Sequence, residues 1–129
     1  MNWTDIASVD RFPIERGVAA RVAGRDVAVF RLHTGEWYAL DNVDPFTGMS
    51  LLARGLVGSV GDAPTVAAPL YKQRFDLRTG ICLDDPNFMV ASWPVRVIDG
   101  SVQISLSSVR AVAEPGRQLA DTSIDEVAA

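Results

Sequence analysis

The sequence is poor in the residues that bind metals and form covalent cross-links. Among its 129 residues there is one cysteine, Cys82, and one histidine, His33. A single cysteine excludes an internal disulfide and a thiolate metal cluster, and such a composition is typical of a reducing compartment. We therefore expect a cytoplasmic location.

Long apolar runs and a basic stripe are also lacking. Nowhere do about 18 apolar residues follow one another, and the N-terminus has neither a basic nor a long apolar segment, so membrane spanning and secretion are not expected. The 12 basic residues include one lysine, Lys72, and are scattered along a chain of net charge −4. Nucleic-acid binding usually needs a basic stripe that releases counterions. We expect neither a membrane nor a nucleic acid as a partner.

The few residues able to do chemistry are more simply explained as structural. His33 stands beside a Thr-Gly turn and reads as a solvated turn histidine. Cys82 lies among apolar residues and reads as a buried small hydrophobe. No orienting or oxyanion feature accompanies these two. Asp84 and Asp85 precede a Pro-Asn loop and read as solvated turn acids. We expect no catalytic, metal-binding or cofactor-binding residue in this chain.

What the sequence has is a series of short β-rich runs separated by turns. With 48% hydrophobic residues, the chain is long enough for one domain with its own core. Asp99-Gly100 between alternating hydrophobic residues is the strongest hairpin signal, because a type I′ turn needs positive φ at both central positions. Up to residue 106 no helix-period segment exceeds two turns, which predicts an all-β fold, a small sandwich or barrel. The expected strands lie at 17–23, 26–32, 36–40, 65–68, 74–77, 81–83, 95–97 and 102–106.

The last segment, 107–129, has a different composition. It is rich in Ala, Glu, Ser and Arg and is interrupted by Pro115-Gly116, so we interpret it as a C-terminal tail. Within it, residues 123–126 match the Ser-x-x-Glu pattern of a capping box, but a motif this short often occurs by chance, so the whole segment is treated as a tail.

Two stretches resemble the halves of a Rieske iron-sulfur motif. Residues 68–80, Ala-Pro-Leu-Tyr-Lys-Gln-Arg-Phe-Asp-Leu-Arg-Thr-Gly, are similar to Cys-Pro-x-His-x-x-x-Phe-Asp-x-x-Thr-Gly, with Ala68 at the cysteine and Tyr71 at the histidine. Residues 39–46 are similar to the first half, Leu-x-Asn-x-Cys-Pro-His, with Asp44 at the cysteine and Phe46 at the histidine. A Rieske centre needs two thiolates and two imidazoles. All four ligand positions are substituted, so no cluster is expected.

The resemblance implies a Rieske-type fold without its cluster, a small antiparallel sandwich or barrel with an inserted two-loop subdomain. We place the domain at 1–106, with the former cluster loops at about 41–56 and 68–76. Phe46 and Tyr71 either fill the volume that the cluster and its imidazoles would take, or face a partner. For the second possibility, the docking residues we predict are Phe46, Met49, Leu70, Tyr71, Lys72 and Arg74.

Both loops, with residues 50–58 and 93–97, make the chain similar to the small subunits of NAD(P)H-dependent assimilatory nitrite reductase. The resemblance implies a large catalytic subunit with FAD, a [4Fe-4S] cluster and sirohaem that reduces nitrite to ammonium. The present chain would then be a non-catalytic small subunit in nitrate and nitrite assimilation. The alternative is a free-standing, cluster-less module that binds or regulates another oxidoreductase.

Overall fold

The computed structural model describes residues 2–107 and 123–127. Its elements are strands joined by turns, with two 3-10 helices, which confirms the all-β prediction. They are β1 Thr4–Ser8, η1 Val9–Arg11, β2 Arg16–Val22, β3 Arg25–Arg31, β4 Trp37–Asp41, η2 Leu52–Arg54, β5 Leu56–Val60, β6 Ala63–Ala67, β7 Arg74–Asp76, β8 Ser92–Trp93, β9 Val95–Ile98, β10 Ser101–Ile104 and β11 Ser123–Val127.

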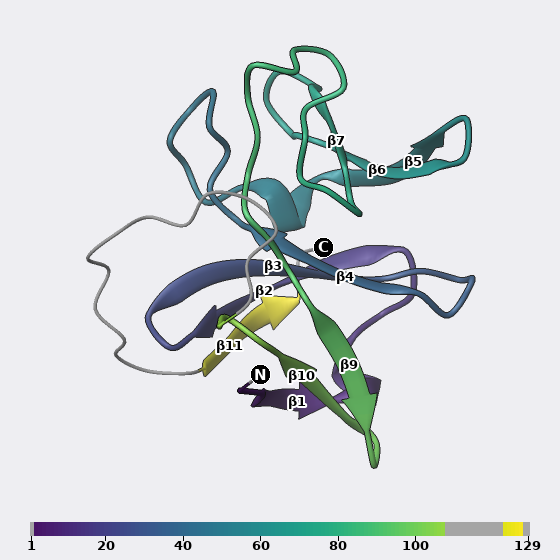
Figure 1. The fold of residues 1–129 in the computed structure, drawn as a ribbon, viewed down its shortest axis with the longest axis vertical. Helices are drawn as coiled ribbons and strands as arrows, with labels where there is room; N and C mark the ends of the chain where they lie inside the picture. Colours follow the sequence, from purple (N-terminus) through teal and green to yellow (C-terminus); the bar gives the residue numbers. More distant parts are fainter. Residues whose placement is uncertain (1, 108–122, 128–129) are drawn as a thin grey trace.

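Three antiparallel sheets make up the fold (Figure 1). The main sheet has the order β11-β2-β3-β4-β8 and lies in the middle of the view. A second sheet, β1-β10-β9, lies below it, and a small sheet, β5-β6-β7, lies above it with the loops that flank it. The small sheet and its loops form the inserted two-loop subdomain that the Rieske resemblance implied.

The main sheet is buried on both faces. Because successive side chains of a strand point to opposite faces, β3 sends Val27 and Val29 into one hydrophobic core and Ala28 and Phe30 into the other. The first core joins the main sheet to β1-β10-β9, and the second joins it to the small sheet. The loops are therefore held by a core of their own.

Of two hairpin turns that the sequence predicts, one lies at the expected residues and the other is shifted by one residue. At Asp99-Gly100 the φ angles are 50° and 76°, the positive pair that a type I′ turn requires. The β2–β3 turn lies at Ala23-Gly24, with φ of 49° and 82°, one residue earlier than Gly24-Arg25, the position expected from the sequence. Both hairpins keep the register of their strands without a bulge.

Residues 123–127 belong to the segment interpreted as a tail, and they do not form the helical turn that a capping box would begin. Ser123–Val127 is strand β11, which pairs antiparallel with β2, with Ser123 opposite Arg21 and Ile124 opposite Ala20. A four-residue capping pattern does not by itself nucleate a helix, whereas the open edge of β2 offers a row of backbone donors and acceptors. Part of the segment predicted as a tail thus joins the main sheet, and residues 108–122 of that segment lie outside the described residues.

Asn42 and Gly17 fix the position of the subdomain on the main sheet. The Asn42 side-chain oxygen accepts a hydrogen bond of 2.7 Å from the backbone N–H of Ala53, and the Asn42 carbonyl accepts two of 3.0 Å from Leu51 and Leu52. On the other side, η2 packs so closely on β2 that a Cβ at Gly17 would overlap the backbone of Ala53. These contacts set the starting point of the small sheet.

Among the described residues, no helix is long and apolar enough to cross a membrane.

Candidate docking surface at the former cluster loops

The two former cluster loops lie at the same end of the molecule and touch through aromatic rings. The first loop joins β4 to η2, and the second joins β6 to β7. Phe46 in the first loop packs on Phe75 of β7 with ring centroids 6.3 Å apart, and on Phe88 at 4.2 Å. The scaffold thus brings both halves of the altered motif together, as the resemblance implies.

The first loop is closed by a tight turn that Asp44 caps. Its Oδ1 accepts a hydrogen bond of 2.8 Å from the backbone N–H of Phe46, and its carbonyl accepts one of 2.7 Å from Gly48. The Thr47 hydroxyl accepts one of 3.2 Å from Met49, whose carbonyl in turn accepts one of 2.8 Å from the N–H of Asp44. Gly48 sits at φ 74°.

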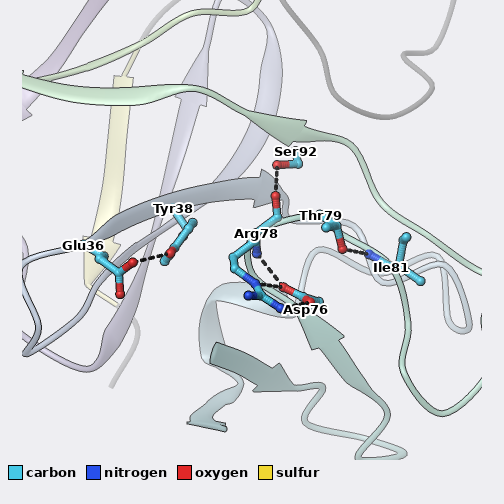
Figure 2. A network of polar contacts seen from close by, with 7 residues as sticks. All are labelled: Glu36, Tyr38, Asp76, Arg78, Thr79, Ile81 and Ser92. Atoms are coloured by element: carbon cyan, nitrogen blue, oxygen red, sulfur yellow. Dashed lines mark hydrogen bonds and ion pairs between the residues drawn. The ribbon is translucent and has the colours of Figure 1, made fainter. Parts of the chain in front are cut away.

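The same turn recurs at residues 76–81, after β7. Oδ1 of Asp76 accepts from the N–H of Arg78 at 2.8 Å, its carbonyl accepts from Gly80 at 2.7 Å, and the Thr79 hydroxyl accepts from Ile81 at 3.2 Å. Gly80 sits at φ 81°. The two turns share the sequence Asp-x-x-Thr-Gly and an antiparallel bridge around it, 43 with 50 and 75 with 82. Figure 2 shows the second of them.

This repeat explains the residue at the first cysteine position. Asp44 is fully buried, and its carboxylate is used to close the turn rather than to face a metal. Its second oxygen, Oδ2, is buried without a hydrogen-bond partner in the described part of the chain. This structural role of Asp44 was not predicted, although the repeated Asp-x-x-Thr-Gly is a sequence signal for it.

The side chains at the other three ligand positions differ in burial. Ala68 is fully buried and offers a methyl group. Phe46 is partly buried against the second core. Tyr71, in contrast, is 64% exposed. Internal filling of the former cluster volume is therefore wrong for Tyr71, which is exposed, and for Phe46 it stays a prediction that agrees with the partial burial of this ring.

This donor set does not fit a [2Fe-2S] cluster. A methyl group and a phenyl ring carry no lone pair for iron, and the Asp44 carboxylate is engaged in its turn. Within residues 2–107 no group of three or more His, Cys, Asp and Glu side chains is placed to hold a metal ion.

The tips of the loops carry exposed apolar side chains. Met49 is 52% exposed and Leu70 is 53% exposed, next to Tyr71. Lys72 is also exposed and adopts a positive φ of 63°, which turns the chain sharply at the tip of the second loop. These four residues, Met49, Leu70, Tyr71 and Lys72, are called the loop-tip surface below.

Arg74, the last predicted docking residue, is held by a carboxylate. Its Nη2 lies 2.7 Å from Oδ1 of Asp84, and its backbone N–H donates to Oδ2 of Asp84, also at 2.7 Å. The hydrogen bonds from Arg74 lower the pKa of Asp84 below its ordinary value. Asp84 is exposed, as the sequence predicts, and its carboxylate also braces the second loop through Arg74.

A polar network lies between the small sheet and the main sheet (Figure 2). Arg78 donates from Nη2 to Oδ2 of Asp76 at 3.0 Å, and its carbonyl accepts from the Ser92 hydroxyl at 3.4 Å. Burial raises the pKa of Asp76, but the hydrogen bonds and the charge of Arg78 outweigh burial and hold that pKa below its ordinary value. Nearby, Tyr38 donates to Glu36 at 2.8 Å, and burial, followed by this bond, raises the pKa of Tyr38.

His33 and Cys82 occupy unlike environments. His33 is exposed, and its Nδ1 lies 3.1 Å from Oε2 of Glu15. Cys82 is fully buried in the second core, as the sequence predicts. A histidine at the surface and a thiol enclosed by apolar side chains do not form a nucleophile and its base.

The comparisons with known proteins agree with this geometry. The family described as "Rieske-like [2Fe-2S] domain" matches residues 2–105. The chain is 42% identical over 103 residues to the nitrite reductase (NADH) small subunit of Escherichia coli K12, which covers 79% of this chain and 95% of that protein. The solution structure of the nitrite reductase NAD(P)H small subunit from Erwinia carotovora is 35% identical, with a TM-score of 0.70 and 92% of each chain covered.

A third relative is a much longer protein. Over 112 residues, 87% of this chain, it is 40% identical to the nitrite reductase NAD(P)H large subunit of Klebsiella oxytoca. The chain spans 12% of the length of that large subunit.

Proposed function

Since the chain belongs to the family of nitrite reductase small subunits with a Rieske-like [2Fe-2S] domain, we propose that it serves as the non-catalytic small subunit of an NAD(P)H-dependent nitrite reductase. The main support for the proposal is the structure of the two former cluster loops. Their ligand positions hold no donor set for iron, while their frame is kept and their tips are exposed and apolar. A scaffold of this kind suits binding rather than electron transfer.

The partner we propose is the large catalytic subunit. The Klebsiella oxytoca relative supports this choice, because a stretch similar to the present chain is there part of a large subunit's own polypeptide. On this proposal the large subunit carries the FAD, [4Fe-4S] cluster and sirohaem that the resemblance implies, and it passes electrons from NAD(P)H to nitrite. The single buried cysteine remains the reason to place the assembly in the cytoplasm.

The docking site we propose is the loop-tip surface. Apolar and aromatic side chains near the centre of an interface supply most of the binding free energy, and here Leu70 and Tyr71 are more than half exposed. Phe46 supports the surface from beneath through Phe75 and Phe88. Arg74 lies at its border, fixed by Asp84.

The test is to measure the affinity of the purified chain for its large subunit by biolayer interferometry. The double variant Leu70→Ser with Tyr71→Ser removes two exposed side chains and should weaken binding about tenfold or more. The control is Ile98→Ser, which changes an exposed apolar residue, 44% exposed, beside the β9–β10 turn on the opposite end of the molecule (Figure 1). Its affinity should match that of the wild type.

A folded double variant that binds as tightly as the wild type would overturn the docking site. Failure of every variant and of the wild type to bind a large subunit would overturn the proposed function itself. Circular dichroism of each variant separates loss of binding from loss of fold.

A further inference from the structure

The outer edge of β5 is open and lacks the usual protection of a strand edge. In the described residues β5 pairs with one strand, β6, and it ends the small sheet. Its sequence, Leu-Val-Gly-Ser-Val, contains no charge and no proline, which are the common devices that keep such an edge from pairing. Leu56 is 77% exposed and Val60 is 39% exposed. An edge of this kind is a template for another strand.

The register with β6 shows which backbone groups face outward. A two-residue turn, Gly61-Asp62, makes Val60 and Ala63 a hydrogen-bonded pair. Hydrogen-bonded and non-hydrogen-bonded pairs then alternate along the hairpin, and Val57 and Ser59 belong to non-hydrogen-bonded pairs. Val57 and Ser59 therefore direct their N–H and C=O groups away from β6. Pro64, which has no N–H, stands opposite Ser59, as this assignment requires. Four backbone groups, two donors and two acceptors, are left for a further strand.

We propose that β5 pairs antiparallel with β5 of a second copy of this chain, about a two-fold axis at Gly58. In that register Val57 lies opposite Ser59 of the partner copy, and their outward groups exchange four hydrogen bonds in total. The two Gly58 residues meet at the centre, where the absence of a Cβ allows close approach. Leu56 lies opposite Val60 of the other copy, so the exposed apolar side chains cover each other.

The charged residues that flank β5 favour a second copy of this chain as the strand that pairs with it. Arg54 and Asp62 are both exposed, lie four residues to either side of Gly58, and form no salt bridge within the described part of the chain. Arg54 ends η2 just before β5, and Asp62 lies in the turn just after it. Antiparallel pairing brings the start of one β5 to the end of the other, so Arg54 of each copy lies at the same end of the interface as Asp62 of its partner copy. An axis one residue away from Gly58 would separate the Leu56–Val60 pairs.

The resulting interface is self-complementary, as a two-fold dimer requires. It lies on the edge of the small sheet and leaves the loop-tip surface unused. If each copy also binds a large subunit, the dimer would join two large subunits into one assembly. This consequence rests on the proposed function, whereas self-association of the chain is independent of it.

The experiment is analytical ultracentrifugation of the full purified chain from about 10 µM to about 1 mM, a range suited to a small interface. The mass should rise from one copy toward two with concentration. Arg54→Asp and Asp62→Arg, each alone, should lower the dimer fraction several-fold, and the double variant should restore it. Restoration by the double variant excludes misfolding as the cause. Leu56→Lys, at a largely exposed position, should give a monomer.

Hydrogen exchange gives a second readout at single residues. The amides of Val57 and Ser59 should gain protection with concentration, while that of Gly58, which already bonds to β6, should not change. A chain that stays monomeric throughout the range overturns the proposal. So does a dimer that is insensitive to both charge reversals and leaves exchange at Val57 and Ser59 unchanged.

Discussion

At the scale of single residues, the most informative position is Asp44. It stands where the related motif has a cysteine, yet its carboxylate closes a turn identical in its hydrogen bonds to the one at Asp76. The substitution thus replaces a ligand by a turn cap and stabilises the loop without metal.

Asp44→Ala should lower the free energy of unfolding by about 1–2 kcal/mol, because the partly buried N–H of Phe46 loses its acceptor. Asp44→Asn is the matched control, since it keeps an oxygen in the capping position and should recover part of the loss. Urea denaturation at pH 7 measures both. Equal stability of Asp44→Ala and the wild type would show that the turn does not depend on its cap.

Asp76 caps the second of these turns and also forms an ion pair with Arg78. Its contribution to the free energy of unfolding therefore depends on pH. Because its folded pKa is below the ordinary value, the carboxylate stabilises the fold above the unfolded pKa, and this stabilisation is lost as pH falls through the folded pKa. The difference in unfolding free energy between wild type and Asp76→Asn should therefore be largest above about pH 5 and shrink below about pH 4. A difference that is constant from pH 7 to pH 3 would contradict the role of the Arg78 pair.

The sequence identified all four former ligand positions, but not their environments. Nothing in the residue types tells that Phe46 stacks on Phe88 while Tyr71, three residues after the buried Ala68, is exposed. Side-chain direction at a loop tip depends on the backbone conformation. Here the backbone turns at Lys72, which has a positive φ, although positive φ is usually indicated by a glycine in the sequence.

At the scale of elements, hairpins were predictable and long-range pairing was not. Asp99-Gly100 carries its turn type in its residues, and the structure confirms it. Strand β11 had no such signal, because its partner β2 is about a hundred residues earlier and its own sequence also satisfies a capping pattern. Local chemistry fixes turns, while the pairing of distant strands is decided by which edge remains open.

The contact of η2 with β2 gives a test at this scale. Gly17→Ala should destabilise the chain by about 2 kcal/mol or more, since its Cβ would overlap backbone atoms of Ala53 that have no rotamer to move to. Gly58→Ala is the control, because its Cβ would meet one atom, Oγ1 of Thr65, at an ordinary 3.8 Å. Thermal unfolding of both at low concentration measures the contrast. A Gly17→Ala variant as stable as Gly58→Ala would show that the subdomain can shift on the sheet.

At the scale of the whole molecule, one sheet with two cores explains how the loops keep their shape without a cluster. The second core includes Phe75, Leu77 and Cys82 beneath the loops, and Asn42 ties the first loop to η2. Packing and backbone hydrogen bonds thus supply the order that iron ligation gives elsewhere. The domain is therefore ordered without iron, and we propose that it binds the large subunit of a nitrite reductase.

Binding to this partner can be tested by tagging the chain, expressing it in its own host grown on nitrate, and identifying by mass spectrometry what co-purifies. We expect a sirohaem-containing flavoprotein and NAD(P)H-dependent nitrite reduction in the eluate. Recovery of the chain alone, or with an unrelated oxidoreductase and no nitrite reduction, would contradict it and favour the free-standing module.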